Sequence, residues 1–273
     1  MPVSGWNSAV VNDRWYFLTV GFPQADNAVT FLSYDPAADE WTSLPVPPAA
    51  AAARLVAAGD RVMAISSSDE QVKAIDSVFD PASGSWQQMP DDPLGPSFDR
   101  GAVWLGDALL LTAKDLVPNP GSEKPSLVRL AMLDTTLTQW TLLPDSEILG
   151  GNPVSIAGRV VFPSTGSADG GEVNNWGRPF PFGGIFNPAD SSWAPLPDPP
   201  AATGLDGYIL SVGDNTLVGG HLLNPATGGW TVVPTLPGPS RNSATVLANT
   251  DTIVVWGGAA GDQNLADGYM LHF

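Results

Sequence analysis

Short apolar runs of four to six residues, separated by turn residues, recur along the whole chain, and none has the 3.6-residue spacing of an amphipathic helix. Many of these runs come in pairs that flank a two- or three-residue turn of Gly, Asn or Asp, which is the pattern of a β-hairpin. Six such turns occur, at 12–13, 59–60, 106–107, 158–159, 213–214 and 249–251. The pattern therefore predicts an all-β protein.

A second pattern surrounds five tryptophans, namely Trp41, Trp86, Trp140, Trp193 and Trp230. Asp or Asn stands six residues before each, followed by Pro in four of the five, and another Pro stands four residues after each. An Asx-Pro pair favours a tight turn between two antiparallel strands, and proline suits the end of an edge strand. The tryptophan supplies the area to fill the gap between neighbouring sheets.

The tryptophans are 45, 54, 53 and 37 residues apart, which is typical of propeller blades. Six hairpins and five tryptophan strands predict a six-bladed β-propeller whose last blade has three strands. Because a blade cannot bury both faces alone, we expect one domain over residues 1–273. The expected blades span about 3–48, 49–93, 94–146, 147–200, 201–239 and 240–273.

The last repeat, with Gly257-Gly258 closing an apolar run and Asp267-Gly-Tyr following, resembles a kelch repeat of the galactose-oxidase-like propellers. Tyr34-Asp35-Pro36 and Trp41 carry the later part of the motif in the first repeat. The resemblance covers the whole chain, although at the motif's own position, directly after an apolar run, the double glycine is kept elsewhere only at 219–220. It implies a scaffold that serves in protein binding, in sugar binding and, less often, in catalysis. The copper site of galactose oxidase needs a cysteine, and this chain has none.

Charge and composition narrow the possible partners. Asp and Glu number 28 against 11 Lys and Arg, a net charge of -17, so nucleic acid and anionic membrane surfaces are poor partners. Without cysteine there can be no disulfide, zinc-thiolate site or iron–sulfur cluster. We expect a monomer that needs no metal and no cofactor. The first residues lack the features of a signal peptide, which leaves a cytoplasmic protein, or a secreted one with its signal removed, as the alternatives.

Loop lengths predict which face carries a binding site. If the strands of a blade are a, b, c and d, the b–c and d–a connections share one face of the propeller. The longest connections, 114–125 and 164–181, are both of the b–c kind and belong to blades three and four. Long loops in compact domains are usually functional, so the ligand is expected on this face, near these two blades.

Polar residues at the entrance to each a strand are candidates to line a central funnel. They are Trp6, Asn7, Arg54, Asp99, Arg100, Asn152, Asp206 and Arg241. On one interpretation Arg100 and Arg241 clamp a carboxylate or a hydroxyl-rich ligand. On the other, these arginines tie neighbouring loops together.

The insertion of blade four combines polar and aromatic side chains, and its candidate ligand residues are Glu172, Asn175, Trp176 and Arg178. Its aromatics could stack on a sugar face, or they could pin the insertion to the blade. Asp169 and Glu172 do not have the spacing of an established calcium loop, so no metal site is predicted.

Together these features predict a recognition module that binds a polar, sugar-like small ligand or a protein on the long-loop face. The alternative is a metal-independent isomerase, cyclase or lyase. It would place its site in the central funnel, with Asp99, Asp206 and His221 as candidate catalytic residues. A third possibility is an assembly role, in which the open edge of the last blade pairs with another chain.

Overall fold

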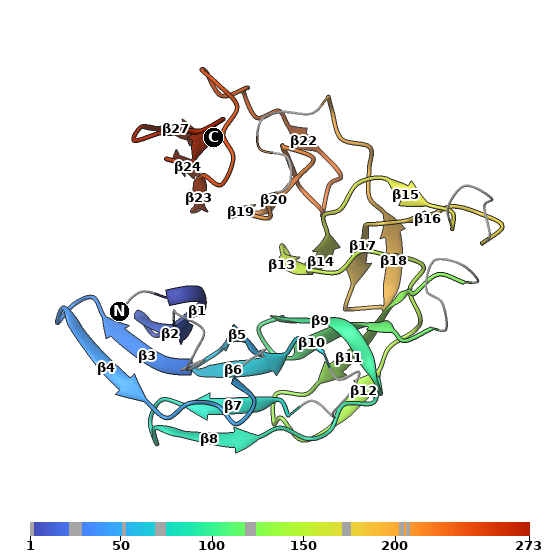
Figure 1. The fold of residues 1–273 in the computed structure, drawn as a ribbon. Coiled ribbons are helices and arrows are strands. Elements are labelled where there is room, and N and C mark those ends of the chain that lie inside the picture. Colours follow the sequence, from blue (N-terminus) through green and yellow to red (C-terminus); the bar gives the residue numbers. More distant parts are fainter. Residues whose placement is uncertain are drawn as a thin grey trace. The chain divides into compact units, whose positions relative to one another are not determined.

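The computed structural model describes residues 3–21, 29–50, 53–68, 75–117, 124–170, 176–201, 205 and 208–273; the side chains of residues 3–6, 20 and 21 are not described. The chain divides into two compact units, Met1–Glu147 and Ile148–Phe273. Strands are the main regular elements in both units (Figure 1). The described part of the chain contains no helix long and apolar enough to cross a membrane.

The first unit consists of three four-stranded antiparallel sheets, in each of which consecutive strands are neighbours (Figure 1). The first sheet contains β1 (Val3–Val11), β2 (Arg14–Gly21), β3 (Val29–Asp35) and β4 (Glu40–Leu44). The second contains β5 (Ala53–Ala58), β6 (Arg61–Ser66), β7 (Ser77–Asp80) and β8 (Ser85–Gln88). The third contains β9 (Ser97–Trp104), β10 (Leu109–Asp115), β11 (Val128–Leu133) and β12 (Trp140–Leu142).

The second unit also has three main sheets, and two of them carry a small two-stranded ribbon between their second and third strands. The fourth sheet contains β13 (Val154–Ile156), β14 (Arg159–Phe162), β17 (Gly184–Asn187) and β18 (Ser192–Pro195), with the ribbon β15 (Ser167–Ala168) and β16 (Phe180–Pro181). The fifth contains β19 (Ser211–Val212), β20 (Asn215–Val218), β21 (His221–Leu223) and β22 (Trp230–Thr231). The sixth contains β23 (Thr245–Ala248), β24 (Thr252–Trp256) and β27 (Gly268–His272), with the ribbon β25 (Ala259–Ala260) and β26 (Gln263–Asn264).

These six sheets are the blades of a six-bladed β-propeller. The all-β fold is confirmed, and so is the three-stranded last blade, which has the order β23-β24-β27. The organisation of the two units as one domain stays a prediction.

The turns form for the reasons that the sequence indicates. In the first hairpin, Asn12 and Asp13 both have a positive φ, of 50° and 60°, as a type I′ turn requires. At the turn between β3 and β4, the Asp35 carboxylate accepts hydrogen bonds from the backbone N–H groups of Ala37 and Ala38, at 3.0 and 3.2 Å. These backbone bonds hold the pKa of Asp35 below its ordinary value, and the same holds for Asp80 at the next such turn.

Three of the repeated tryptophans, Trp86, Trp140 and Trp230, lie where successive blades meet within a unit. Trp86 packs against the apolar cluster shared by the first two blades, and Trp140 against the cluster shared by the second and third. Each indole N–H also donates to the carbonyl of a repeated proline in the preceding blade, Trp86 to Pro45 at 2.7 Å and Trp140 to Pro90 at 2.9 Å. In the second and third blades the repeated tryptophan and proline therefore form part of the junction between blades.

Candidate functional site

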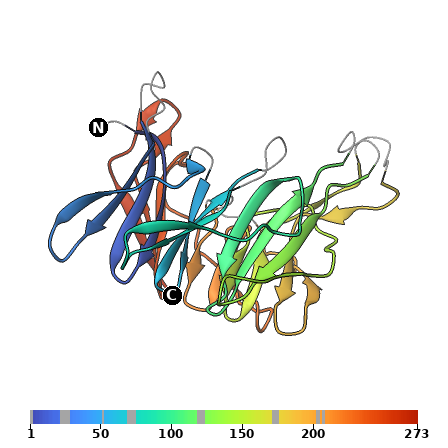
Figure 2. The ribbon, with the colours of Figure 1, turned by 90° about the horizontal axis from the view of Figure 1, so that it is seen from below.

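The long insertion of the fourth blade folds back on itself and creates a cleft. The ribbon β15–β16 extends this blade beyond β14 and β17, and Figure 2 shows it in the yellow part of the chain. Gly166, with a φ of 84°, turns the chain into the ribbon, and its carbonyl accepts a bond from the N–H of Phe182 at 2.9 Å. Gly183 lies so close to the carbonyls of Phe162 and Ser164 that any side chain there would clash.

The cleft lies between this insertion and the segment that leaves β18, and has a volume of about 260 Å³. The insertion contributes Ser164, Thr165, Gly166, Ser167, Pro181 and Gly183, and the other wall is formed by Pro195, Leu196, Pro197, Asp198 and Pro199. The cleft therefore combines three hydroxyl groups and one carboxylate with the flat apolar surfaces of proline rings. Such a surface can exchange several hydrogen bonds with a small polar molecule.

The aromatic residues of the insertion lie on the other side of the ribbon. Ser167 and Pro181 are paired in register and line the cleft, whereas Ala168 and Phe180 form the next pair, whose side chains point to the opposite face. Trp176 contacts Phe180 edge to face, with ring centres 6.0 Å apart. The guanidinium of Arg178 lies 4.1 Å from the centre of the Phe180 ring.

This arrangement favours the interpretation in which Trp176 and Phe180 pin the insertion, over one in which Trp176 is a sugar platform of the cleft. Glu172 and Asn175, the other candidates on this insertion, lie outside the described residues, as does Asp206. A ligand-binding role for these residues stays a prediction.

Asn7 joins the first strands of two blades. Its side-chain amide donates to the carbonyl of Ala53 at 3.1 Å and accepts from the N–H of Leu55 at 2.7 Å. The Asn7 amide thus forms the pair of hydrogen bonds that a neighbouring strand would otherwise form with the backbone of β5. The neighbouring Trp6 lies in β1, but its side chain is not among those described.

Arg54, in β5, and Asn152, just before β13, are both exposed. Each has a polar or electrostatic interaction within the chain. Asn152 also has a positive φ of 60°.

Arg100 is turned inward by a β-bulge. Thr112 of β10 pairs with Gly101 and Lys114 pairs with Phe98, so that Asp99 and Arg100 together oppose a single residue. Asp99 has a φ of 47°, and its carboxylate points outward to form an ion pair with Lys114 at 3.1 Å. The side chain of Arg100 is wholly buried.

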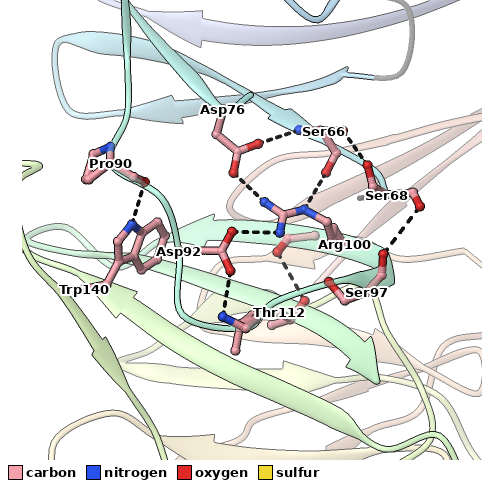
Figure 3. A network of polar contacts seen from close by, with 11 residues as sticks. Ser66, Ser68, Asp76, Pro90, Asp92, Ser97, Arg100, Thr112 and Trp140 are labelled. Carbon is pink, nitrogen blue, oxygen red and sulfur yellow. Dashed lines mark hydrogen bonds and ion pairs between the residues drawn. The ribbon is translucent and has the colours of Figure 1, made fainter. Parts of the chain in front are cut away.

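The buried guanidinium of Arg100 is surrounded by acceptors from the second blade and the segment that follows it (Figure 3). Its Nη2 lies 2.5 Å from a carboxylate oxygen of Asp76, and its Nη1 donates to Asp92 at 3.0 Å. Its Nε donates to the carbonyl of Ser66 at 3.1 Å. All three nitrogens therefore have partners, and Arg100 ties the loop ends of one blade to the first strand of the next.

The two carboxylates of this network are themselves held by the backbone. The N–H of Ser66 donates to Asp76 at 2.8 Å, and the N–H of Leu94 donates to Asp92 at the same distance. Burial raises the pKa of Asp76 above its ordinary value, although the adjacent Arg100 charge and the bond from Ser66 oppose this shift. The negative charge of Asp92 also raises the pKa of Asp76, because it repels a second negative charge nearby.

His221, a candidate general base, is buried directly after the Gly219-Gly220 turn, with 2 % of its surface exposed. Its Nδ1 accepts from the N–H of Val233 at 3.1 Å, so the proton of a neutral ring lies on Nε2, which is 2.6 Å from the carbonyl of Ala201. Both ring nitrogens thus have partners in the backbone. This is expected for a side chain that holds the segments around Ala201 and Val233 in place.

Arg241 lies in the second unit, just before the sixth blade, and its side chain is only 4 % exposed. It donates to the carbonyl of Gly257 and to Asp267. Because Arg100 and Arg241 belong to different units, a clamp formed by both stays a prediction.

Three features of these sites were missed by reasoning from the sequence. The cleft wall at 195–199 is visible in the sequence only as a proline-rich segment. The carboxylate partners of Arg100 lie 8 and 24 residues away from it in the sequence, too far for a local motif. The carbonyl of the repeated proline accepts a hydrogen bond from a tryptophan of the next blade, which the spacing alone does not indicate. Among the described residues, no group of three or more His, Asp or Glu side chains is placed to hold a metal ion.

No protein-family model matches this chain, and a comparison with curated proteins gives no significant match. The structure thus supports the propeller fold, while membership of the kelch family stays a prediction from the repeated motifs.

Proposed function

We propose that the protein is a recognition module that binds a small, neutral, hydroxyl-rich ligand, such as a monosaccharide, in the cleft of the fourth blade. One observation carries this proposal: the cleft of about 260 Å³ lies on the longest insertion and is lined by three hydroxyl groups and the Asp198 carboxylate. A carboxylate and hydroxyls together can accept from and donate to the hydroxyls of one sugar ring. The proline rings offer apolar surface to its C–H groups.

The net charge of the chain favours a neutral ligand over an anion at this position. With 28 acidic and 11 basic residues, the protein repels anions on average, and none of the described residues that line the cleft is basic. The alternative of an enzyme has less support, because Asp99 is paired with Lys114 and His221 has both nitrogens bonded to the backbone.

The test is a titration of the whole protein with a panel of neutral mono- and disaccharides. Binding is measured by calorimetry and, independently, by ligand-observed NMR. We expect saturable binding of at least one sugar. Asp198→Ala should weaken it by about tenfold or more, since it removes a charged hydrogen-bond acceptor. Thr165→Trp should abolish it by filling the cleft.

The matched control is Asp262→Ala, which removes an exposed carboxylate from the turn of the β25–β26 ribbon. This variant should bind like the unmodified protein. Absence of saturable binding across the panel would overturn the proposal, as would binding that neither Asp198→Ala nor Thr165→Trp affects.

A further inference from the structure

The sheet of the sixth blade has an open edge. It ends at β27, which pairs with β24 on one side and with no described strand on the other. The other five blades have a fourth strand at this place, and in each of them that strand carries the repeated tryptophan. An unpaired strand presents its backbone donors and acceptors to any extended chain that reaches it.

The pairing with β24 decides which backbone groups of β27 face outward. The carbonyl of Asp267 accepts a bond from the N–H of Gly257, at 2.9 Å, so every second residue from 267 to 273 directs its backbone groups toward β24. The remaining positions are Gly268, Met270 and His272. No described residue bonds to their N–H and C=O groups, and Met270 is 60 % exposed. The strand also contains neither Lys nor Pro, which protect many natural edges.

The third blade shows how a fourth strand pairs at this position. There Leu133 of β11 lies opposite Trp140 of β12. The equivalent of Leu133 in the sixth blade is Leu271, because each pairs with the residue that forms the last pair before the first hairpin turn, Leu109 or Ile253. Both leucines also belong to the apolar cluster shared with the preceding blade. A tryptophan opposite Leu271 would therefore face the fifth blade.

The acceptor for the indole of such a tryptophan is present in the fifth blade. Trp86 and Trp140 each donate to the proline carbonyl that stands four residues after the repeated tryptophan of the preceding blade. In the fifth blade that proline is Pro234, four residues after Trp230. Pro234 is exposed, and no described residue donates to its carbonyl. The open edge and the unused carbonyl thus both match a strand that carries a tryptophan.

We propose that the open edge of β27 binds an extended segment of another protein, which pairs antiparallel with β27 and completes the blade. The segment carries a tryptophan opposite Leu271, with its indole N–H on the Pro234 carbonyl. An apolar residue and a proline follow three and four positions later, as in the other five blades. The residue after the tryptophan exchanges backbone bonds with Met270, as Thr141 does with Met132 in the third blade. The backbone bonds supply affinity, and the tryptophan supplies selectivity.

The experiment is a titration of the whole protein with a labelled peptide of the sequence 138–144, Thr-Gln-Trp-Thr-Leu-Leu-Pro, observed by fluorescence anisotropy. This sequence contains the fourth strand of the third blade and has no charged side chain, so the net charge of -17 does not oppose its binding. We expect saturable binding, together with slower hydrogen exchange at the amides of Met270 and His272.

Two altered peptides test the two parts of the contact. The peptide with Trp140→Ala should bind about tenfold more weakly or worse, because it loses the aromatic contact and the indole N–H. N-methylation of the residue after the tryptophan removes the N–H that would bond to the Met270 carbonyl. It should weaken binding to a similar degree, without any change in the protein.

Met270→Pro and Met270→Thr are the matched pair of protein variants. Proline removes the outward N–H of position 270 but no bond to β24, so this variant should not bind the peptide. Threonine keeps the N–H, and Met270→Thr should bind within about twofold of the unmodified protein. Circular dichroism of both variants checks the fold. Asp198→Ala in the sugar cleft should leave peptide binding unchanged, so the two proposals can fail independently.

Three results would overturn the proposal. They are the absence of saturable binding, equal binding of either altered peptide, and a dimer of the protein that Met270→Pro dissociates and the peptide does not. In the last case the edge would hold a second copy of this chain.

Discussion

Arg100 and Arg241 occupy equivalent places in the sequence, each just before the apolar run that begins a blade, yet the structure uses them differently. Arg100 meets two carboxylates and a carbonyl, and all three of its nitrogens have partners. Arg241 meets one carboxylate and two carbonyls, and its buried Nε has no acceptor among the described residues. The arrangement of the acceptors around the guanidinium, rather than their number, thus decides whether every nitrogen of a buried arginine has a partner among the described residues.

The largest expected effect is on the Arg100 network. Arg100→Met should lower the free energy of unfolding by about 3–5 kcal/mol, because it leaves the buried carboxylates of Asp76 and Asp92 without a cation. Urea denaturation of the unmodified protein and the variant measures this difference.

Arg14→Met is the matched control for Arg100→Met, since Arg14 forms a partly exposed ion pair with Asp35. Arg14→Met should lower the free energy of unfolding by less than about 1 kcal/mol. If Arg100→Met prevents folding, the triple variant Arg100→Met, Asp76→Leu, Asp92→Leu should restore much of the stability by replacing the ionic group with apolar side chains. Equal costs for Arg14→Met and Arg100→Met would contradict a structural role for the buried network.

A smaller effect is expected at the second arginine. Arg241→Gln should lower the free energy of unfolding by about 1 kcal/mol. It removes bonds to two carbonyls and an exposed carboxylate, but it also removes a buried N–H that has no acceptor among the described residues. The same urea denaturation measures it. If Arg241→Gln lowered the free energy of unfolding as much as Arg100→Met, the two arginines would contribute equally to stability, and the difference between their networks would have no energetic consequence.

The smallest effect is a dependence on pH that only the first site should show. Because burial raises the pKa of Asp76 above its ordinary 3.8, the folded state binds this proton more tightly than the unfolded state. The associated stability is present in full below pH 3.8 and is lost as the pH rises through the folded pKa. The stability of the unmodified protein relative to Asp76→Asn should therefore fall as the pH rises from about 3.

Asp80 provides the opposite sign as a control. Backbone hydrogen bonds lower its pKa, so its stabilisation is present above pH 3.8 and is lost as the pH falls. The stability of the unmodified protein relative to Asp80→Asn should rise with pH over the acidic range. The same sign for both variants, from denaturation at a series of pH values, would rule out the burial effect at Asp76.

The fold could be predicted largely because its signals are local. A hairpin turn needs residues that tolerate a positive φ, such as Asn12 and Asp13, and an Asx turn needs the side-chain oxygen of a residue such as Asp35. Both requirements act within a few residues, so they are visible in the sequence of each blade. The resulting count of turns was sufficient to predict six sheets and a shorter last one.

The candidate site could be predicted only in its general position. The length of the 164–181 insertion indicated the fourth blade, but the cleft also requires the segment 195–199, which folding brings to the insertion from beyond two strands. The alternation of the short ribbon decides that Ser167 faces the cleft and that Phe180 points away from it. A sequence cannot give that register before the pairing is known.

By itself, then, the sequence determined the strands, the turns and the repeated use of tryptophan and proline, because these depend on local backbone preferences and on a periodic apolar pattern. Only the tertiary structure decided the partners of the polar residues. Asp76 reaches Arg100 across 24 residues, and the acceptors of Arg241 at Gly257 and Asp267 lie 16 and 26 residues beyond it. Hydrogen bonds between distant segments depend on the packing of whole sheets, and that packing exists only once the chain has folded.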